Sequence, residues 1–131
     1  MFLFQQGFFL TVSPDSIMDI AKQACQNNKM FMMNLSAPFL SQFFKEPMMK
    51  AFPYVDLLFG NETEAQTFAK EQNLKASNGA MIDIALEIAS LPKENKLRTR
   101  VVVITQGKDD VIVAKGRLNS SFILREPSNL Y

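Results

Sequence analysis

The sequence contains no histidine and a single cysteine, Cys25. Without histidine, the protein lacks His-dependent catalytic triads, His-ligated metal sites and the usual proton carrier at neutral pH. One cysteine excludes a disulfide framework within the chain and a cysteine-rich zinc site. Any chemistry must therefore use carboxylates, hydroxyls, backbone amides and basic side chains.

The sequence also lacks a large excess of one charge sign and long apolar runs. Fourteen Lys and Arg against thirteen Asp and Glu give a net charge of +1, so neither nucleic acid nor a membrane surface is indicated as the main partner. No stretch approaches the ~20 apolar residues of a membrane-spanning helix. The apolar segment 1–10 is interrupted by Gln5, Gln6 and Gly7 and lacks the features of a secretory signal. We expect an intracellular protein in which Cys25 is a reduced, inert thiol on an apolar helix face.

The 131 residues, 47% of them hydrophobic, suit one domain with an ordinary core. Apolar runs predict strands at 2–10, 30–35, 54–59 and 101–105, a hairpin strand at 111–114 and a further strand at 121–124. Helical spacing and capping signals predict helices from Pro14 to about 26, from 36 to about 44, from Asn61 to about 72 and over 81–91. The charged segment 93–100 is predicted to be a solvated loop. This order predicts an α/β domain with a mostly parallel sheet and a terminal hairpin.

Small and polar residues follow several of the predicted strands. In open α/β sheets, ligands bind beyond the carboxyl ends of the strands. Asn34 follows the second strand, Asn61 and Glu64 follow the third, and Thr105 with Gly107 follows the fourth. The pattern therefore places a candidate binding site at this edge of the sheet.

Glu64 allows two interpretations. Asn61 and Glu64 have the spacing of a capping box, in which the two side chains satisfy the first amides of a helix. Alternatively, Glu64 orients water on Mg²⁺ beside a phosphate group.

The other candidate residues also allow both a structural and a functional interpretation. Thr105 and Gly107 fit an ordinary turn, but a glycine there also lets backbone amides approach a phosphate. Phe8 and Phe39 suit a hydrophobic core, and they also suit the walls of a pocket for a flat purine ring.

Four segments, at 7–13, 34–39, 58–65 and 105–110, occur in an order that resembles the ribokinase-like (PfkB) carbohydrate kinase family. The resemblance runs from about residue 7 to 116. It implies the central portion of a three-layer α/β/α fold with a mostly parallel sheet. Among members of the family, the segments are most similar to those of enzymes that transfer the γ-phosphoryl group of ATP to the 5′-hydroxyl of adenosine with Mg²⁺, giving AMP and ADP in purine salvage. A cytoplasmic and nuclear location is implied as well.

The same resemblance assigns roles to individual residues. Phe8 is similar to a phenylalanine that stacks on the adenine ring, and Phe39 to a second wall of that pocket. Asn61 and Glu64 match the family's N-x-x-E motif, which positions Mg²⁺ and phosphate; this assigns Asn61 to the binding of ATP and Glu64 to the metal. Asn34, and likewise Thr105 with Gly107, would then contact ATP.

The chain departs from the family in one important respect. The family completes its site with a Gly-Ala-Gly-Asp segment, whose amides hold an anion and whose Asp takes the proton from the attacking hydroxyl. None of the five glycines lies in such a segment. We therefore expect residues 1–131 to form an incomplete ribokinase-like domain, without the lid and the C-terminal anion-binding segment. We expect this chain to be inactive by itself and to self-associate through open sheet edges and uncovered apolar faces.

Two alternatives remain open at this point. The first is that the chain belongs to another sugar or nucleoside kinase of the same superfamily. The second is that it is a non-catalytic α/β interaction module.

Overall fold

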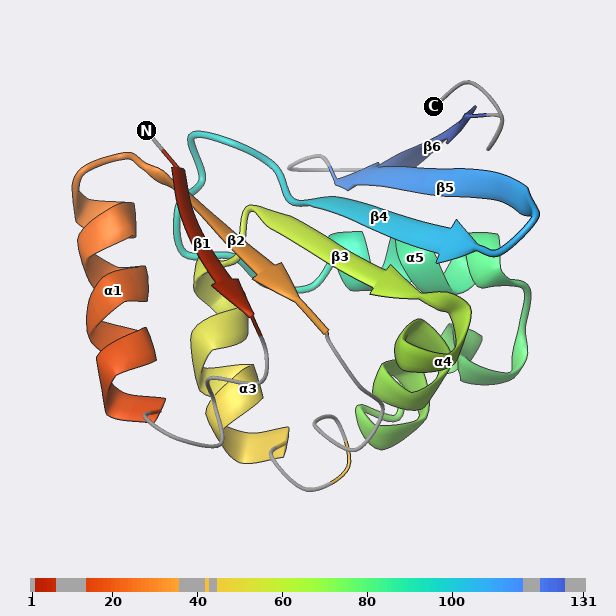
Figure 1. Ribbon diagram of the computed structural model, residues 1–131, viewed down its shortest axis with the longest axis horizontal. Coiled ribbons are helices and arrows are strands. Elements are labelled where there is room, and N and C mark those ends of the chain that lie inside the picture. The colour runs from red at the N-terminus through yellow and green to blue at the C-terminus, as the bar shows by residue number, and fades with distance from the viewer. Residues whose placement is uncertain (1, 7–13, 36–41, 43–44, 117–120, 127–131) are drawn as a thin grey trace.

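The computed structural model describes the backbone of residues 2–6, 14–35, 42, 45–116 and 121–126, and the side chains of 15–35, 42 and 45–116. Within these residues the chain alternates between strands and helices (Figure 1). In chain order the elements are β1 (Phe2–Gln6), α1 (Pro14–Gln26), β2 (Met30–Asn34), α3 (Lys45–Ala51), the 3₁₀ turn η2 (Phe52–Tyr54), β3 (Leu57–Asn61), α4 (Glu62–Glu71), the 3₁₀ turn η3 (Lys75–Asn78), α5 (Met81–Ala89), β4 (Val101–Gln106), β5 (Asp109–Gly116) and β6 (Ser121–Glu126).

The described strands form one sheet in the order β1-β2-β3-β4-β5-β6. Strands β1 to β4 are parallel neighbours, whereas β5 and β6 are added by antiparallel pairing. Each parallel neighbour follows the previous strand through a helical crossover, as the alternating sequence pattern requires. The predicted mostly parallel sheet with a terminal hairpin is therefore confirmed.

The helices α1, α3, α4 and α5 all lie on one face of this sheet (Figure 1). Strands that pair in sequential order through right-handed crossovers place every crossover helix on the same side. On this helical face, Met33, Leu58, Val102 and Ala114 are partners in neighbouring strands, and each is fully buried. The hydrophobic core thus lies between the sheet and the single helical layer.

We call the opposite side of the sheet the outer face. Along β2, β3 and β4 its residues alternate with the fully buried ones, and most are only half-buried. One cross-strand row contains Met32, Leu57 and Val101, and the next contains Asn34, Phe59, Val103 and Val113. No described helix covers this apolar surface, so the described residues form two layers.

The third strand begins later than its apolar run predicts. Residues 54–59 are predicted to be extended, but Phe52–Tyr54 forms a 3₁₀ turn and β3 starts at Leu57. Pro53 lies at the start of this turn, where its fixed φ favours a helical conformation. The strand then continues through Gly60 to Asn61, so both residues belong to the sheet edge rather than to a following turn.

The segment 93–100 is a loop, as predicted, but it is not solvated throughout. Asn95 and Arg100 are 7% and 1% exposed, respectively. Cys25, which is predicted to lie on an apolar helix face, is half-buried near the end of α1. Phe8 and Phe39 lie outside the described residues.

Among the described residues, no helix combines the length and the apolar character needed to cross a bilayer.

Candidate functional site

A hollow of about 470 Å³ lies at the carboxyl ends of β2, β3 and β4. Four of the residues that the sequence singles out line it: Asn34, Asn61, Glu64 and Thr105. The rest of the lining comes from Phe59, Gly60 and Val103. Parallel pairing explains this convergence, because Asn34 is the register partner of Phe59 and Asn61 is that of Thr105.

Asn61 and Glu64 form the capping box that their spacing predicts. The Asn61 Oδ1 accepts a hydrogen bond from the Glu64 amide at 2.8 Å, and the Glu64 Oε2 accepts one from the Asn61 amide at 2.9 Å. Glu64 is only 7% exposed. Its carboxylate is therefore fixed in place in the first turn of α4, beside amides that carry the positive end of the helix dipole.

The carboxylate position also depends on Gly60. A Cβ atom at residue 60 would lie 2.9 Å from the Leu35 Cδ1 and 3.3 Å from the Glu64 Oε2. A side chain would thus press on the carboxylate and on the neighbouring strand end. Gly60 is not among the predicted site residues, although its position directly before a helix cap at a strand end is a usable signal.

Gly107 does not line the hollow that Asn34, Asn61, Glu64 and Thr105 share. It adopts φ +62° in the two-residue turn between β4 and β5, and nothing lies within 4 Å of the position its Cβ would occupy. The residues that line the hollow include Thr105 but not Gly107. Its observed contribution is the left-handed turn conformation, which glycine adopts without strain.

The described residues contain no group of three or more acidic or cysteine side chains close enough to hold a metal ion. Glu64 is the single carboxylate that lines the hollow. This donor set does not suit an all-protein cage, but it does suit Mg²⁺, which commonly uses one or two carboxylates together with water and substrate phosphates.

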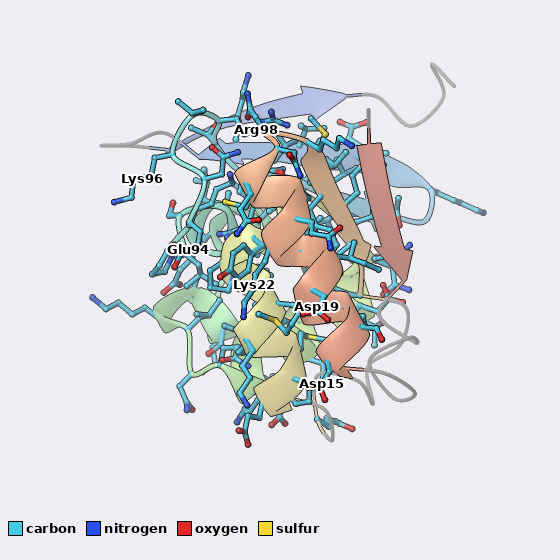
Figure 2. The ribbon with its side chains drawn as sticks, turned by 90° about the vertical axis from the view of Figure 1, so that its left-hand side faces the viewer. Asp15, Asp19, Lys22, Glu94, Lys96 and Arg98 are labelled. Atoms are coloured by element: carbon cyan, nitrogen blue, oxygen red, sulfur yellow. The ribbon has the colours of Figure 1, made fainter. Side chains whose placement is uncertain are left out.

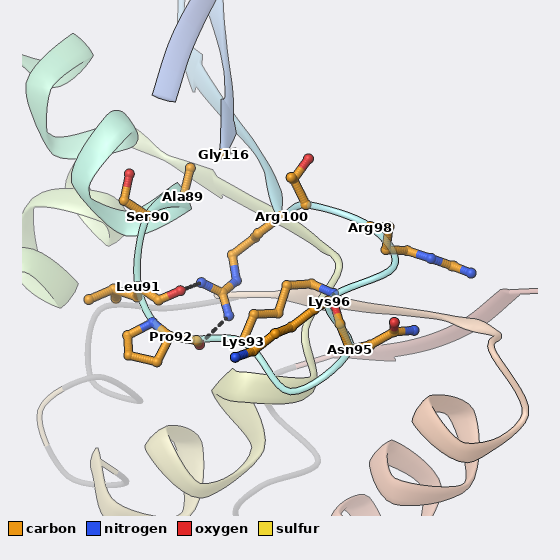
Figure 3. Close-up of a pocket in the computed structure, with 11 residues that line it drawn as sticks. Ala89, Ser90, Leu91, Pro92, Lys93, Asn95, Lys96, Arg98, Arg100 and Gly116 are labelled. Carbon is orange, nitrogen blue, oxygen red and sulfur yellow. Dashed lines mark hydrogen bonds between the residues drawn. The ribbon is translucent and has the colours of Figure 1, made fainter. Parts of the chain in front are cut away.

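A second polar cluster, which sequence reasoning missed, surrounds Arg100 at the start of β4 (Figure 3). The Arg100 guanidinium lies 4.3 Å from the Phe52 ring centroid. It donates hydrogen bonds of 2.8 to 3.3 Å to five backbone carbonyls, those of Phe52, Val55, Ile88, Leu91 and Pro92.

Burial lowers the pKa of Arg100 to about 10, and the Asp56 carboxylate acts in the opposite direction. Arg100 therefore stays protonated at neutral pH. Asp56, 3% exposed, pairs with the Lys93 Nζ at 2.5 Å and accepts a hydrogen bond from the Phe31 amide at 2.8 Å. The cluster ties the end of α5 and the turn η2 to the sheet. The local sequence does not predict this cluster, because the acceptors of the Arg100 hydrogen bonds are backbone carbonyls of other segments of the chain.

The pfkB family carbohydrate kinase model matches residues 1–128 of this chain. The chain therefore belongs to the pfkB family, and the ribokinase-like α/β class predicted from its motifs is confirmed. The family consists of kinases, so the hollow at the carboxyl ends of the parallel strands lies in a phosphotransferase fold.

Several curated relatives of the chain are adenosine kinases. The chain is 50% identical over 123 residues to adenosine kinase of Schizosaccharomyces pombe, covering 93% of this chain and 36% of that protein. It is 48% identical over 114 residues to adenosine kinase 2 of Arabidopsis thaliana, covering 87% of this chain and 32% of the relative. The chain thus spans about a third of the length of the curated relatives that it matches.

Solved structures give the same result. Anopheles gambiae adenosine kinase in complex with P1,P4-di(adenosine-5) tetraphosphate superposes with a TM-score of 0.88 at 47% identity, over 96% of this chain and 36% of that one. Schistosoma mansoni adenosine kinase in complex with adenosine and AMP gives a TM-score of 0.81 at 32% identity, over 95% of this chain and 36% of the other. The resemblance to adenosine kinases is therefore found in the fold as well as in the sequence.

Proposed function

We propose that this chain is part of an adenosine kinase, which transfers the γ-phosphoryl group of ATP to the 5′-hydroxyl of adenosine. The observation that carries the proposal is the convergence of Asn34, Asn61, Glu64 and Thr105 on one hollow, in a chain 50% identical to an adenosine kinase. The relatives of known structure bind adenosine, AMP or a diadenosine tetraphosphate, as their names state. We place the protein in the cytoplasm and the nucleus.

The roles proposed for the residues rest on the resemblance to the family, and the place of Asn34, Asn61, Glu64 and Thr105 around the hollow supports theirs. The amides at the start of α4 and the side chains of Asn34 and Thr105 would face the phosphates and ribose of ATP. Phe8 and Phe39 would form the walls of the adenosine pocket. Gly107 would shape the β4–β5 turn near the nucleotide.

The Glu64 carboxylate would repel a phosphate group that bound directly beside it, so a cation between them is required by charge. When bound, Mg²⁺ would neutralise charge on the transferring phosphates. Glu64 would orient a water of that ion, while its Oε2 keeps the hydrogen bond to the Asn61 amide. The capping and metal roles of Glu64 are therefore compatible.

We further propose that the 131-residue chain does not catalyse the reaction by itself, because the family's Gly-Ala-Gly-Asp segment is absent from its sequence. The test uses two proteins: this chain alone, and a chimera in which it replaces the 123 matched residues of the Schizosaccharomyces pombe adenosine kinase. The chimera is expected to form AMP from adenosine and ATP, and the isolated chain is expected to form none.

The variant Glu64→Gln tests the site within the chimera. Glutamine keeps an oxygen that can accept the Asn61 amide, so the helix cap survives while the charge is lost. Glu62→Gln is the matched control, because Glu62 lies in the same first turn and is exposed. We expect Glu64→Gln to lower kcat at least about tenfold, with Glu62→Gln unchanged. Equal activities of the two variants would refute the role of Glu64, and phosphorylation of ribose or fructose in preference to adenosine would refute the substrate.

The uncovered outer face supports a second proposal, that the isolated chain self-associates. On this face, strands β2 to β4 carry the half-buried apolar side chains of Met32, Phe59 and Val103. Strands β1 and β6 are the outermost strands of the sheet within the described residues. Sedimentation of the isolated chain over a concentration series is expected to show oligomers. A single monomeric species at all concentrations would contradict this proposal.

A further inference from the structure

Glu64 is one of two buried carboxylates among the described residues. Asp15 and Asp19, labelled on α1 in Figure 2, are exposed instead. The other buried carboxylate, that of Asp56, is paired with Lys93. None of the described lysines or arginines pairs with Glu64, whose Oε2 accepts a hydrogen bond from a backbone amide. A buried charge without a counter-charge is unfavourable, so the neighbouring residues must keep this carboxylate in place.

Gly60 leaves the space in which this carboxylate lies. Residues 58 and 60 of β3 are both buried on the helical side of the sheet, where Leu58 belongs to the core and residue 60 has no side chain. A Cβ atom at residue 60 would lie 2.9 Å from the Leu35 Cδ1 and 3.3 Å from the Glu64 Oε2. Glycine inside a strand weakens the strand and commonly marks a close approach of another group. The approaching groups here are the Leu35 side chain and the Glu64 carboxylate.

These two neighbours of Gly60 differ in how tightly they are confined. Leu35 is fully buried, and its amide donates a hydrogen bond to the Phe59 carbonyl at 2.9 Å. Close packing leaves such a side chain little room to move. The Glu64 carboxylate lies at the wall of an open hollow instead. A side chain at residue 60 would therefore displace the carboxylate more readily than Leu35, and would strain its hydrogen bond to the Asn61 amide.

We propose that Gly60 is a positioning residue for the metal of the candidate site. Its missing side chain lets the Glu64 carboxylate lie against β3, and this placement sets the affinity of the site for a divalent cation. The inference rests on the proposed function, which assigns the metal to Glu64. The role requires no contact of Gly60 with the metal or with a phosphate, because it acts through the carboxylate. A methyl group at residue 60 should therefore weaken metal binding only while the carboxylate is present.

The test measures Mg²⁺ binding to the chimera with the Schizosaccharomyces pombe adenosine kinase, in the presence of ADP. The readout is the rise in unfolding temperature over a series of Mg²⁺ concentrations, which gives the concentration at half-saturation without any turnover. The variants are Gly60→Ala, Glu64→Gln and the two combined. Gly79→Ala is the matched control, because a Cβ atom at residue 79 would lie 3.3 Å from the Ala76 carbonyl oxygen and Gly79 does not line the hollow.

We expect Gly60→Ala to raise the Mg²⁺ concentration at half-saturation about tenfold and Gly79→Ala to change it less than about twofold. In the Glu64→Gln background, Gly60→Ala should have no further effect, because the displaced carboxylate is gone. The effects of two residues that act as one unit are not additive. An equal effect of Gly60→Ala in both backgrounds would overturn the proposal, as would an unchanged half-saturation in Gly60→Ala. A parent chimera that does not respond to Mg²⁺ would overturn it too.

Leu35→Val separates the metal effect from packing. Valine lacks the Cδ1 atom, so adding it to Gly60→Ala relieves the 2.9 Å contact and keeps the contact with the carboxylate. This combination also replaces Gly60→Ala if the single variant does not fold. We expect half-saturation to stay raised relative to Leu35→Val alone, and a return to the parent value would overturn the proposal. The proposed function is judged separately: a parent chimera that leaves adenosine unphosphorylated would refute the substrate, whereas the Mg²⁺ comparison would still decide the role of Gly60.

Discussion

Substitution of Arg100 by Met is expected to destabilise the fold by about 3 kcal/mol. Methionine has a similar length and no polar group, so the change removes the charge and the five hydrogen bonds while filling most of the space. Three of these bonds, to Val55, Ile88 and Phe52, are fully buried. The Ile88 and Phe52 carbonyls each keep a backbone donor, at 3.2 and 3.0 Å.

The magnitude follows from these opposing effects. A buried acceptor left without a donor costs about 1–3 kcal/mol, whereas removal of a buried charge relieves its desolvation penalty. The remaining donors limit the loss at two carbonyls, so the net cost lies near the lower end of the range for breaking a buried charged network. This loss is a large fraction of the stability of a domain, which is commonly about 5–15 kcal/mol.

The assay is urea unfolding followed by circular dichroism, with Arg100→Lys as the comparison. Lysine keeps the charge and three donors but loses the planar fork, so we expect an intermediate loss of about 2 kcal/mol. A loss below about 1 kcal/mol for Arg100→Met would refute the reasoning, since it would mean that the five carbonyls do not need this donor.

The pH dependence provides an independent check. The folded state holds the pKa of Arg100 at about 10, below its ordinary value, so the folded state releases the proton first. Between these two values the unfolded state binds more protons, and the contribution of Arg100 to stability rises with pH. Below about pH 9 both states hold the proton. The difference between the parent and Arg100→Met should therefore be equal at about pH 6 and about pH 9, and a clear change between them would contradict the assigned pKa.

Three further substitutions test the site region, each by the same unfolding assay. Gly60→Ala should lower the free energy of unfolding by about 1–3 kcal/mol, because the new methyl group would lie 2.9 Å from the Leu35 Cδ1 and 3.3 Å from the Glu64 Oε2. An unchanged unfolding midpoint would show that these two side chains move aside at little cost. Asn61→Ala should cost about 1 kcal/mol through loss of the helix cap, whereas Asn61→Asp should retain it; equal losses would argue against the cap. Gly107→Ala should cost about 1 kcal/mol because of its φ of +62°, and it should weaken ATP binding by the chimera because the turn is proposed to lie near the nucleotide; unchanged binding would argue against that role.

The parts of the fold that sequence reasoning predicts well have local causes. The run from Val101 to Thr105 is β-branched at every position, which favours a strand. The capping box of Asn61 and Glu64 depends on residues three apart, and the structure contains both of its hydrogen bonds. Parallel pairing then brings Asn34 and Thr105 to the same edge without any further information.

The parts that it predicts poorly depend on distant partners. Arg100 lies in a charged segment that is typical of a solvated loop, and only the folded chain shows five carbonyls around its guanidinium. The late start of β3 has a similar origin. The apolar residues Tyr54 and Val55 fit a strand, but Tyr54 ends the 3₁₀ turn that begins at Phe52, and the carbonyls of Phe52 and Val55 on either side of it both accept hydrogen bonds from the distant Arg100.

The position of the candidate site links its chemistry to the uncovered outer face. Asn34, Phe59, Val103 and Thr105 all belong to that face, whereas Glu64 enters the hollow from the start of α4 on the helical side. Strands that are apolar on both faces are typical of parallel sheets covered on both sides. A layer docked on the outer face would therefore close the hollow and exclude water from it, which strengthens every charge interaction inside. It follows that ligand affinity at Glu64 should rise when the outer face is covered, even if the docked layer contributes no side chain to the ligand.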